Sequence, residues 1–572
     1  MLTNQDVART FSRVAVLLTL QGENRRRIMA YERAANAVSA LEQDIQDVWR
    51  RGALENISGI GETLAAKIEE MLTSGKLELD ERLQREVPPG VVEMLSIPEI
   101  GPRRAARFWK ELGVTSVDAL EEAAREGRVR AMSRMGAKTE RSLLENIAFW
   151  RRWQGQVPLG RAWVIAYSVL DSLAGVSGVE RAAVGGGVRR FRDAVQDIDI
   201  IISASDRSAV VACLRAHPAI DQVLSNGDVL VAARTQDGIA LNVHLADLPD
   251  WGSCLLYHTG SRAHNALLGR LALDQGYRWE RGRLERLGKH IVAKSEQEIY
   301  DRLGLFWIPP EVREGAGEFD PTAARLFSSL VERSDLKGDL QMHTTGSDGH
   351  QSIAQMAEAA RANGLQYVLI TDHSQSLGVA GGQSVPELRQ QRSEIRALNA
   401  RFDNLCILSG TEVEIKADGS LDYPDEVLAE LDLVVASLHT GHRSSRDQVT
   451  HRMLAAIRNP HVDIIAHPTN RLIGRRAGLE LDMQAILGAA NEMGTALEIN
   501  AHPDRLDLCA EHIKMAVEAG VKLAISSDAH DVSDLGLLFF GVGTARRGWA
   551  SRENVINTWD LDRLLAWAGN RV

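Results

Sequence analysis

The segment Gly185-Gly-Gly-Val-Arg-Arg-Phe-Arg-Asp-Ala-Val-Gln-Asp-Ile-Asp-Ile-Ile-Ile202 places two aspartates in an apolar run. Asp197 and Asp199 are two residues apart, so on an extended strand both carboxylates point to the same face. Two like charges this close repel each other unless a cation lies between them. The glycine-rich turn and the two arginines just upstream are suited to phosphate. This pattern predicts a divalent-metal site for a nucleotide.

The chain has 572 residues, which is too long for a single hydrophobic core and predicts several domains. Its composition is that of an ordinary soluble globular protein, without an apolar run of ~18 residues that could span a membrane. The N-terminal residues lack the basic-then-apolar pattern of a signal peptide. A reducing cytoplasm is expected because the cysteines form no Cys-x-x-Cys pair: Cys213, Cys254, Cys406 and Cys509.

The formal net charge of −11 argues against a nucleic-acid partner for the chain as a whole. A global balance says little about a local patch, however. Residues 97–152 carry 12 Lys and Arg against 8 Asp and Glu, a net charge of +4. This basic segment permits a DNA-binding module on an otherwise acidic chain.

Residues 5–150 read as short amphipathic helices with an internal repeat. An apolar-x-x-apolar-Gly turn followed by a helix occurs at residues 57–67 and 97–107, and a weaker third copy is expected at 132–138. Glycine lets such a turn approach a phosphate closely, and the following helix offers free N–H groups. One copy alone would be a helix-turn-helix packing unit, whereas two copies with flanking arginines favour DNA. The candidate DNA-binding residues are Gly59, Gly61, Gly101, Arg103 and Arg104.

From about residue 164 to residue 245 the pattern changes to short apolar strands, two of them separated by the hairpin signal Thr-Gln-Asp-Gly. Residues 336–572 alternate short apolar strands with helical stretches, which predicts a β/α architecture. Several of these strands end in a residue that can bind a metal, and in barrels of this type the chemistry lies at the C-terminal strand ends. The candidate ligands are His343, Asp348, His373, Glu412, His439, His467, Asp528 and His530.

These ligand types suit Zn²⁺, Mn²⁺ or Fe²⁺, and eight of them exceed what one ion can use. We therefore expect a cluster of two or three ions, with Glu412 as a bridging ligand. Such a cluster activates water at neutral pH and binds a phosphate group. An isolated histidine is more often a satisfied polar group than a ligand, but five strand ends in succession are not explained in that way.

The helix-turn repeats ahead of Gly-Gly-x-Arg-Arg-x(6)-Asp-Ile-Asp resemble the front half of a bacterial family X DNA polymerase, which is similar to DNA polymerase beta. The C-terminal ligand spacing resembles the PHP (polymerase and histidinol phosphatase) superfamily, a distorted (β/α)7 barrel with a trinuclear site. The resemblances cover nearly the whole chain and imply a multidomain fold. Its parts are an all-α helix-hairpin-helix region with a lyase-like (1–80) and a fingers-like domain (81–150), an α+β nucleotidyltransferase palm (151–248) and thumb (249–315), a linker (316–335) and the PHP domain (336–572).

The family X resemblance implies roles for individual residues. Asp197 and Asp199 would bind two Mg²⁺ or Mn²⁺ ions. An incoming deoxynucleoside triphosphate would be held by Gly186, Gly187 and Arg190, together with Tyr257, Gly260 and Asn265 from the following segment. Lys67 occupies the position of the Schiff-base lysine in relatives with deoxyribose-phosphate lyase activity, although it also reads as a surface lysine on a helix.

The same resemblance places a third carboxylate where this sequence has Asn242. Asparagine offers a neutral oxygen to a metal but cannot accept a proton, and Mg²⁺ sites depend on carboxylates. Loss of general-base help typically lowers a rate ~10²–10⁴-fold. Gly187, Gln196 and His258 also depart from the family pattern. We therefore expect a weak or inactive polymerase site.

Within the PHP pattern, Gln341 stands where the general motif has a histidine, so one ion is expected to bind less tightly. Candidates to hold substrate phosphate, each of which could also be structural, are Arg475, Arg476 and Arg505. In bacterial family X polymerases this domain is associated with Mn²⁺-dependent 3′–5′ exonuclease activity, whereas free-standing relatives hydrolyse small phosphate monoesters. Fusion to the hairpins and the palm favours a DNA end as substrate, and the resemblance suggests a monomer in the bacterial cytoplasm.

Three functions follow from these observations. The preferred hypothesis is a DNA-repair 3′–5′ exonuclease that acts on gapped DNA or 3′ ends and carries a weak or inactive polymerase site. The second is an active gap-filling DNA polymerase in base excision repair that tolerates Asn242. The third is a non-catalytic scaffold that binds DNA ends, which the near-complete set of metal ligands argues against.

Overall fold

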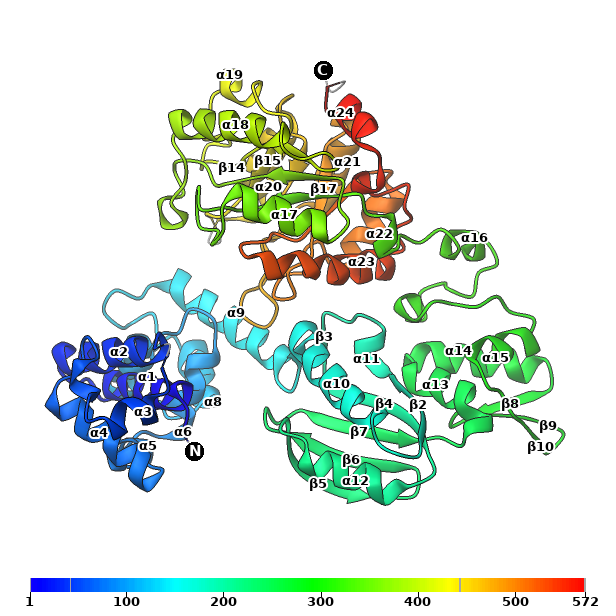
Figure 1. Ribbon diagram of the computed structural model, residues 1–572, viewed down its shortest axis with the longest axis horizontal. Coiled ribbons are helices and arrows are strands. Elements are labelled where there is room, and N and C mark those ends of the chain that lie inside the picture. The colour runs from blue at the N-terminus through cyan, green and yellow to red at the C-terminus, as the bar shows by residue number, and fades with distance from the viewer. Residues whose placement is uncertain (1, 42, 442–443, 570–572) are drawn as a thin grey trace. The chain divides into compact units, whose positions relative to one another are not determined.

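The computed structural model describes residues 2–41, 43–441 and 444–569 of the chain (Figure 1). The chain forms two compact units, Met1–Gln154 and Gly155–Val572, each with its own hydrophobic core. No helix within the described ranges is both long enough and apolar enough to cross a membrane. The multidomain architecture expected from the sequence is confirmed.

The first unit is helical and is built around one hydrophobic cluster. Phe11 from its first half and Val91 and Phe108 from its second half are buried in the same cluster. Regions 1–80 and 81–150, expected as two domains, therefore share a core. The helices are α1 (Asn4–Gln21), α2 (Arg25–Ser39), α3 (Ile45–Arg50), η1 (Leu54–Asn56), α4 (Glu62–Ser74), α5 (Glu78–Glu86), α6 (Pro89–Glu93), η2 (Met94–Ser96), α7 (Pro102–Leu112), α8 (Val117–Arg125) and α9 (Ala137–Trp153).

Three turns of the same geometry precede α4, α7 and α9. In each turn, a residue with positive φ lies two positions before the glycine that begins the helix: Gly59 (88°), Glu99 (64°) and Arg134 (61°). These N-cap glycines make no side-chain cap hydrogen bond, and a Cβ built on any of them meets nothing within 4 Å: Gly61, Gly101 and Gly136. The expected third repeat therefore has the backbone geometry of the other two. All three present the first N–H groups of a helix at an open turn.

The palm, in the second unit, is a five-stranded sheet in the order β2-β4-β7-β6-β5. Strands β4 (Asp197–Ala204) and β7 (Ala240–Leu245) are parallel neighbours, and the other pairs are antiparallel. Ile198 and Ile200 of β4 are fully buried, whereas Asp197 and Asp199 are partly exposed on the opposite face. The other elements are β1 (Val157–Pro158), α10 (Leu159–Ala174), β2 (Val179–Val184), α11 (Gly186–Arg189), β3 (Ala194–Val195), α12 (Arg207–Ala216), β5 (Ile220–Asn226) and β6 (Leu230–Thr235).

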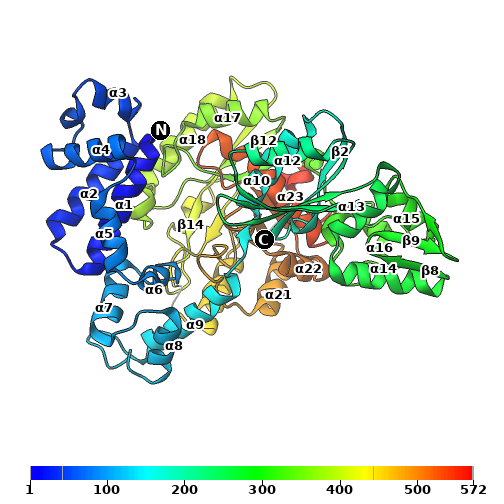
Figure 2. The same cartoon turned by 90° about the horizontal axis from the view of Figure 1, so that it is seen from below.

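In the thumb, helices lie beside a three-stranded antiparallel sheet (Figure 2). Segment 316–335, expected as a linker, is packed into this core, because Ala323, Phe327 and Leu330 are buried in one cluster with Leu268 of the thumb. The elements are η3 (Leu248–Asp250), α13 (Trp251–Thr259), α14 (Arg262–Asp274), β8 (Tyr277–Glu280), β9 (Arg283–Arg286), β10 (Lys289–Ile291), α15 (Glu296–Arg302), η4 (Pro310–Val312), α16 (Ala323–Phe327) and η5 (Arg333–Asp335).

The PHP domain is a barrel of parallel strands, as expected for (β/α)7. Its two sheets, β11-β12-β13 and β14-β15-β16-β17-β18, are joined by bridges between His373 and Glu412 and between Met342 and Ala529. The strands are β11 (Gly338–Met342), β12 (Tyr367–Ile370), β13 (Cys406–Ser409), β14 (Glu412–Glu414), β15 (Val435–Ser437), β16 (Ile464–Ile465), β17 (Ala496–Asn500) and β18 (Leu523–Ser526). In the described chain these occupy seven strand positions, because β13 and β14 are halves of one strand interrupted at residues 410 and 411.

Helices surround the barrel and close one end of it. Val368 and Ile370 of β12 belong to one hydrophobic cluster and the alternating Tyr367 and Leu369 to another, as expected when successive residues face the helices and the interior. The helices are α17 (Ile353–Ala362), η6 (Gly378–Ala380), α18 (Val385–Asn399), α19 (Asp425–Leu428), α20 (Arg446–Ile457), α21 (Met483–Met493), α22 (Ala510–Glu518), η7 (Val532–Leu537), α23 (Leu538–Arg547), η8 (Ile556–Thr558) and α24 (Leu561–Gly569).

Candidate active site

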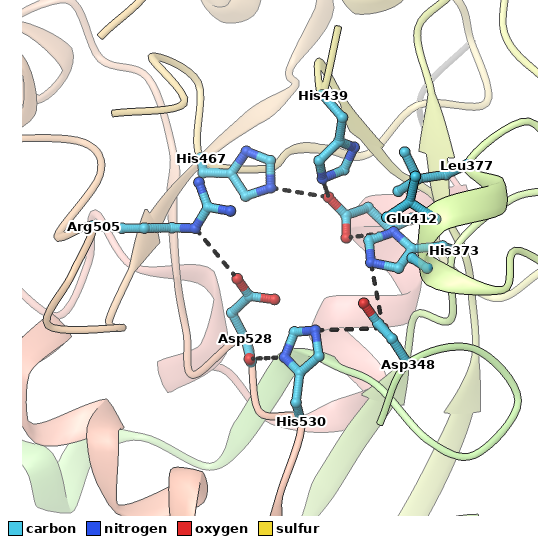
Figure 3. Close-up of a pocket in the computed structure, with 11 residues that line it drawn as sticks. Asp348, His373, Leu377, Glu412, His439, His467, Arg505, Asp528 and His530 are labelled. Carbon is cyan, nitrogen blue, oxygen red and sulfur yellow. Dashed lines mark hydrogen bonds and ion pairs between the residues drawn. The ribbon is translucent and has the colours of Figure 1, made fainter. Parts of the chain in front are cut away.

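The predicted metal ligands converge at the C-terminal edge of the PHP barrel. His343 directly follows β11, Glu412 begins β14, and Asp528 follows β18 by two residues. Parallel strands end at the same edge of a barrel, so their terminal side chains meet over its mouth. In Figure 3 the labelled polar side chains point toward one another around a pocket: Asp348, His373, Glu412, His439, His467, Arg505, Asp528 and His530.

The ligand atoms form three overlapping groups, and within each group they lie within 4.8 Å of one another. The groups are His343, Asp348, His373 and His530; His373, Glu412 and His439; and His343, Glu412 and Asp528. His343, His373 and Glu412 each belong to two groups, so the three groups adjoin one another. His467 lies alongside, with Nε2 3.0 Å from Glu412 Oε1. This sharing favours a cluster over a single ion.

Several buried atoms of the site lack a hydrogen-bond partner among the residues described. They are Nδ1 of His343, His373 and His467 and Oε1 of Gln341. An unpaired polar atom in the interior is costly unless a ligand satisfies it. Imidazole nitrogen and amide oxygen both bind metal ions, so the residues present fit the expected Mn²⁺ or Zn²⁺ cluster.

The charges of the site are arranged to receive cations. Although burial opposes ionisation, the surrounding histidines hold the pKa of Glu412 well below its usual value, and the hydrogen bond to His530 helps to lower the pKa of Asp348 to about 2. Burial lowers the pKa of His373 to about 4, which leaves its ring neutral. Burial alone would lower the pKa of the His530 ring, but its hydrogen bond to Asp348 helps to outweigh this effect and to raise the pKa to about 9. Metal binding would therefore meet ionised carboxylates and displace a proton from His530.

The pocket has a volume of about 280 Å³ and is lined by one of the three candidate arginines, Arg505. Arg476 donates hydrogen bonds to the backbone and side-chain oxygens of Asn470. Arg475 pairs with Asp504 at 3.2 Å. Arg505 also donates to Oδ1 of Asn470, at 2.9 Å, but it lines the pocket and is for that reason the candidate best placed to meet a substrate phosphate.

Sequence reasoning missed three polar residues that support the ligands. Glu414 Oε2 accepts a hydrogen bond from Nδ1 of His439 at 2.9 Å, which orients that ring. Asn500 donates to Oδ2 of Asp528 at 3.0 Å, and Glu498 lies two residues before it on β17. A signal was present, since each is a polar residue that alternates with apolar residues along its strand.

In the palm, strand register places Asn242 directly beside the two aspartates. Asp199 is the register partner of Asn242 across the parallel pair β4 and β7. Nδ2 of Asn242 lies 3.3 Å from Oδ2 of Asp197 and 3.3 Å from Oδ1 of Asp199. The asparagine thus contacts both carboxylates, and its amide donates to them.

His244 is a palm residue to which the sequence analysis assigned no role. It lies two residues beyond Asn242, so strand alternation already placed it on the same face. Its Nε2 is 2.9 Å from Oδ1 of Asp199, and its ring stacks on His258 with centroids 3.6 Å apart. Burial and His244 lower the pKa of His258 to about 4, while burial and Asp199 raise the pKa of Asp197.

The glycine-rich turn approaches the aspartates closely. Gly186 has φ 56°, and a Cβ on it would lie 2.2 Å from Oδ2 of Asp199, so a larger residue would not fit. A Cβ on Gly187 would also meet a side chain, at 2.7 Å. Arg190 is buried, and its Nε donates to Glu314 at 2.9 Å. Its guanidinium is thus engaged within the protein, and its role toward a triphosphate stays a prediction.

The other three predicted nucleotide-binding residues lie together where α13 meets α14. Nδ2 of Asn265 donates to the carbonyl of Tyr257 at 2.8 Å. Gly260, between the two helices, has φ 70°, and a Cβ there would lie 3.1 Å from Nη1 of Arg190. This group therefore adjoins the glycine-rich turn of the palm.

In the helical unit, Lys67 lies half-buried on α4, the helix that follows the first turn. Arg103 is exposed at the start of α7, whereas Arg104 donates to the carbonyl of Glu99 at 2.9 Å. The roles of these residues toward DNA stay predictions.

Protein-family models match successive parts of the chain. A helix-hairpin-helix domain matches residues 2–77, and a SAM-like helix-hairpin-helix tandem matches 91–148, which spans the second and third turns. The DNA polymerase beta thumb matches residues 254–314, and the PHP domain matches 339–502.

Relatives match both the whole chain and a part of it. The DNA polymerase/3′-5′ exonuclease PolX of Bacillus subtilis (strain 168) is 38% identical over 561 residues, 97% of this chain and 98% of that protein. A probable phosphatase of Thermoanaerobacter sp. (strain X514) is 32% identical over 234 residues, 38% of this chain and 90% of that protein. A probable phosphatase of Acetivibrio thermocellus is 30% identical over 208 residues, 35% of this chain and 81% of that protein. The chain therefore belongs to the bacterial family X DNA polymerases that carry a C-terminal PHP domain.

Proposed function

We propose that this protein is a DNA-repair 3′–5′ exonuclease that hydrolyses phosphodiester bonds at DNA ends in its PHP domain. One observation carries the proposal. Ionisable ligands from six strand ends and Arg505 meet in one pocket, where buried ligand atoms have no hydrogen-bond partner among the described residues. The Bacillus subtilis relative is named a DNA polymerase/3′-5′ exonuclease, which supports the same function.

The residues of the pocket would divide the work between metal and substrate. The ligand groups would hold a cluster of two or three Mn²⁺ or Zn²⁺ ions, which when bound supply Lewis-acid activation of the phosphate and of water. Glu414 keeps the ring of His439 oriented as a ligand. The guanidinium of Arg505 would bind phosphate oxygens, for which its planar donors are suited.

The helical unit would hold the DNA. Its three glycine turns offer backbone N–H groups to phosphates, and such contacts position a duplex without reading its sequence. An exonuclease in repair needs this sequence independence, because gaps and damaged ends arise anywhere. Gapped duplexes and 3′ ends are therefore the proposed substrates.

Gap filling is a second candidate function. It is favoured by the register of β4 and β7, which keeps Asp197 and Asp199 on one face beside the glycine-rich turn. It is disfavoured by Asn242, which cannot replace the missing carboxylate as a base. We propose that the palm binds a Mg²⁺ or Mn²⁺ ion and a deoxynucleoside triphosphate but adds nucleotides weakly.

The first test uses a duplex with a one-nucleotide gap, 5′-labelled on the primer, in Mg²⁺ or Mn²⁺ and with or without nucleotides. Primer shortening with little extension is expected. Extension by one templated nucleotide without shortening would instead make the protein a polymerase. A protein that binds the duplex and changes nothing would be an end-binding scaffold.

Glu412→Gln tests the site assignment. Glu412 belongs to two of the ligand groups, so its loss should lower activity more than the loss of a residue that only orients a ligand. Hydrolysis should therefore fall at least ~100-fold while DNA affinity is retained. Glu430→Gln, a partly exposed residue of the same domain that pairs with Arg389 and Arg392 and does not line the pocket, is the matched control and should hydrolyse DNA as the unmodified protein does. Wild-type hydrolysis by Glu412→Gln would refute the assignment.

A further inference from the structure

The palm and the PHP domain, both within the second unit, meet at the loop after α11. The rings of Phe191 and of Phe539 in α23 have centroids 5.1 Å apart. Glu314 accepts hydrogen bonds from Arg190 of the palm at 2.9 Å and from Arg547 of α23 at 2.7 Å. These contacts hold the palm against α23 without involving the metal site.

A second contact between the two domains reaches the metal site. Nη1 of Arg471, in the loop after β16, lies 2.7 Å from Oδ2 of Asp193 in the palm, with the side chains 18% and 22% exposed. Nε of Arg471 donates to the carbonyl of Arg505 at 2.8 Å, and Nη2 donates to the carbonyl of Leu506. One guanidinium therefore joins a palm carboxylate to the loop after β17.

The loop after β17 carries the pocket arginine in a conformation that needs support. Leu506 has φ 45°, which a branched residue rarely adopts unless its surroundings impose it. The palm also touches this loop where α10 meets Pro503, since a Cβ on Gly160 would lie 2.5 Å from that ring. In Figure 3 the side chain of Arg505 reaches from this loop toward Asp528, with Nε 3.8 Å from Oδ2.

Asp193 is itself fixed by the palm. Its backbone carbonyl accepts a hydrogen bond from the N–H of Leu159, the first residue of α10, at 2.9 Å. A largely buried guanidinium is costly without a carboxylate partner, so Arg471 is held in place by Asp193. The position of the Arg505 backbone thus depends on a charge supplied by the palm.

We propose that Asp193 and Arg471 are positioning residues for phosphodiester hydrolysis, through which the palm holds Arg505 over the metal centre to bind the substrate phosphate. This inference rests on the proposed function of the PHP site. It gives the palm a part in hydrolysis that needs no nucleotide addition.

The test is Asp193→Asn in the full-length protein, which removes the charge and keeps the size. Hydrolysis of a 5′-labelled single-stranded oligonucleotide in Mn²⁺ is measured, together with bound metal. KM should rise roughly 5- to 30-fold, the effect of losing one good interaction, with kcat and metal content unchanged. Asp193→Glu should restore KM. The matched control is Asp237→Asn, which breaks an Asp–Arg pair with Arg161 wholly inside the palm and should leave KM unchanged.

A double variant tests whether the effect passes through Arg505. Asp193→Asn added to Arg505→Lys should raise KM no further than Arg505→Lys alone, because both act on the same contact. If Asp193→Asn fails to fold, Arg471→Lys takes its place, since lysine keeps the charge but has one nitrogen where the three contacts use three nitrogens of a planar guanidinium. An unchanged KM, an additive double variant, or a fall in kcat or metal content without a KM effect would overturn the inference alone. Absence of hydrolysis by the unmodified protein would overturn the proposed function as well.

Discussion

Two clusters of acidic side chains lie at strand positions in this chain, and they differ in what satisfies them. In the palm, the protein supplies the donors. Asn242 contacts both Asp197 and Asp199, and His244 lies 2.9 Å from Asp199. In effect, an amide and an imidazole stand where a cation would relieve the repulsion between the carboxylates.

The PHP pocket is arranged in the opposite way. Its carboxylates also face histidines, but Nδ1 of His343 and His373 and Oε1 of Gln341 are buried without a hydrogen-bond partner in the described chain. Buried polar atoms are normally paired, so a ligand is needed to complete this cluster. Similar residue types thus leave a cluster more or less open to a metal ion, according to how far donors of the protein already contact its carboxylates and how many buried ligand atoms are left without a hydrogen bond.

Asn242→Asp would place a third carboxylate beside Asp197 and Asp199 and so make the palm cluster resemble a metal site. It removes the amide donor and adds a third acid, so that a divalent ion becomes necessary to hold the three charges together. Templated extension of a gapped primer in Mg²⁺ should rise at least ~100-fold, the lower end of what general-base help contributes. Asn226→Asp, on β5 of the same sheet, is the control. Unchanged extension would place the deficiency elsewhere in the palm, for example in the engaged guanidinium of Arg190.

Metal-dependent stability would sharpen the comparison. A ligand at 100 times its Kd stabilises the folded state by about 2.7 kcal/mol, and Mn²⁺ should do this for metal-stripped protein through the PHP site. His373→Ala should lose the stabilisation, and Asp199→Asn should keep it. Urea unfolding with and without Mn²⁺ measures the difference. A loss confined to Asp199→Asn would mean that the palm is the tighter metal site.

Glu414→Gln tests the hydrogen bond that orients the His439 ring in the PHP pocket. The variant weakens the hydrogen bond that orients His439, and loss of such an outer-shell partner typically costs ~10–100-fold in metal affinity or activity. Exonuclease rate as a function of Mn²⁺ concentration should reveal the loss. Glu426→Gln, exposed on α19, should have no effect. Equal rates for both variants would show that His439 needs no such orientation.

The smallest expected effects are on how the free energy of unfolding depends on pH, and they should have opposite signs at the two sites. Burial, and then Asp199, raise the pKa of Asp197, so ionisation of this group costs stability as pH rises through its folded pKa. Asp197→Asn should therefore be more stable than the unmodified protein at pH 7 in the absence of metal. The advantage should disappear at pH values below the ordinary aspartate range. Urea unfolding at several pH values measures it, and a constant difference would contradict the assignment.

Asp348 should behave in the reverse sense. Its pKa of about 2 in the folded protein, against an ordinary value of 3.8, means that its charge adds stability above the ordinary value, which is lost as pH falls toward 2. Asp348→Asn should be less stable at neutral pH in metal-free protein and indistinguishable at about pH 2. The side chain is 35% exposed, so solvent screening keeps the effect small.

Much of the candidate site could be predicted from the sequence. Ligands at the ends of apolar runs and the shared face of Asp197 and Asp199 follow from strand alternation, which is a local property. The place of Asn242 beside the two aspartates was instead implied by the resemblance to family X polymerases. Glycine turns are equally local, and the third hairpin was visible although its pattern was weak. The sequence by itself therefore determined which residue types reach the mouth of the barrel and which face of its strand the Asp197 and Asp199 pair occupies.

Only the tertiary structure decided how those residues are used. It selected Arg505 among three arginines, engaged Arg190 with Glu314, and packed segment 316–335 into the thumb core. It also brought Asp193 to Arg471, although 278 positions separate them in the chain. These outcomes depend on which surfaces pack together. The partner of a charged side chain depends on which residues tertiary packing brings beside it, so it cannot be predicted from the local sequence pattern.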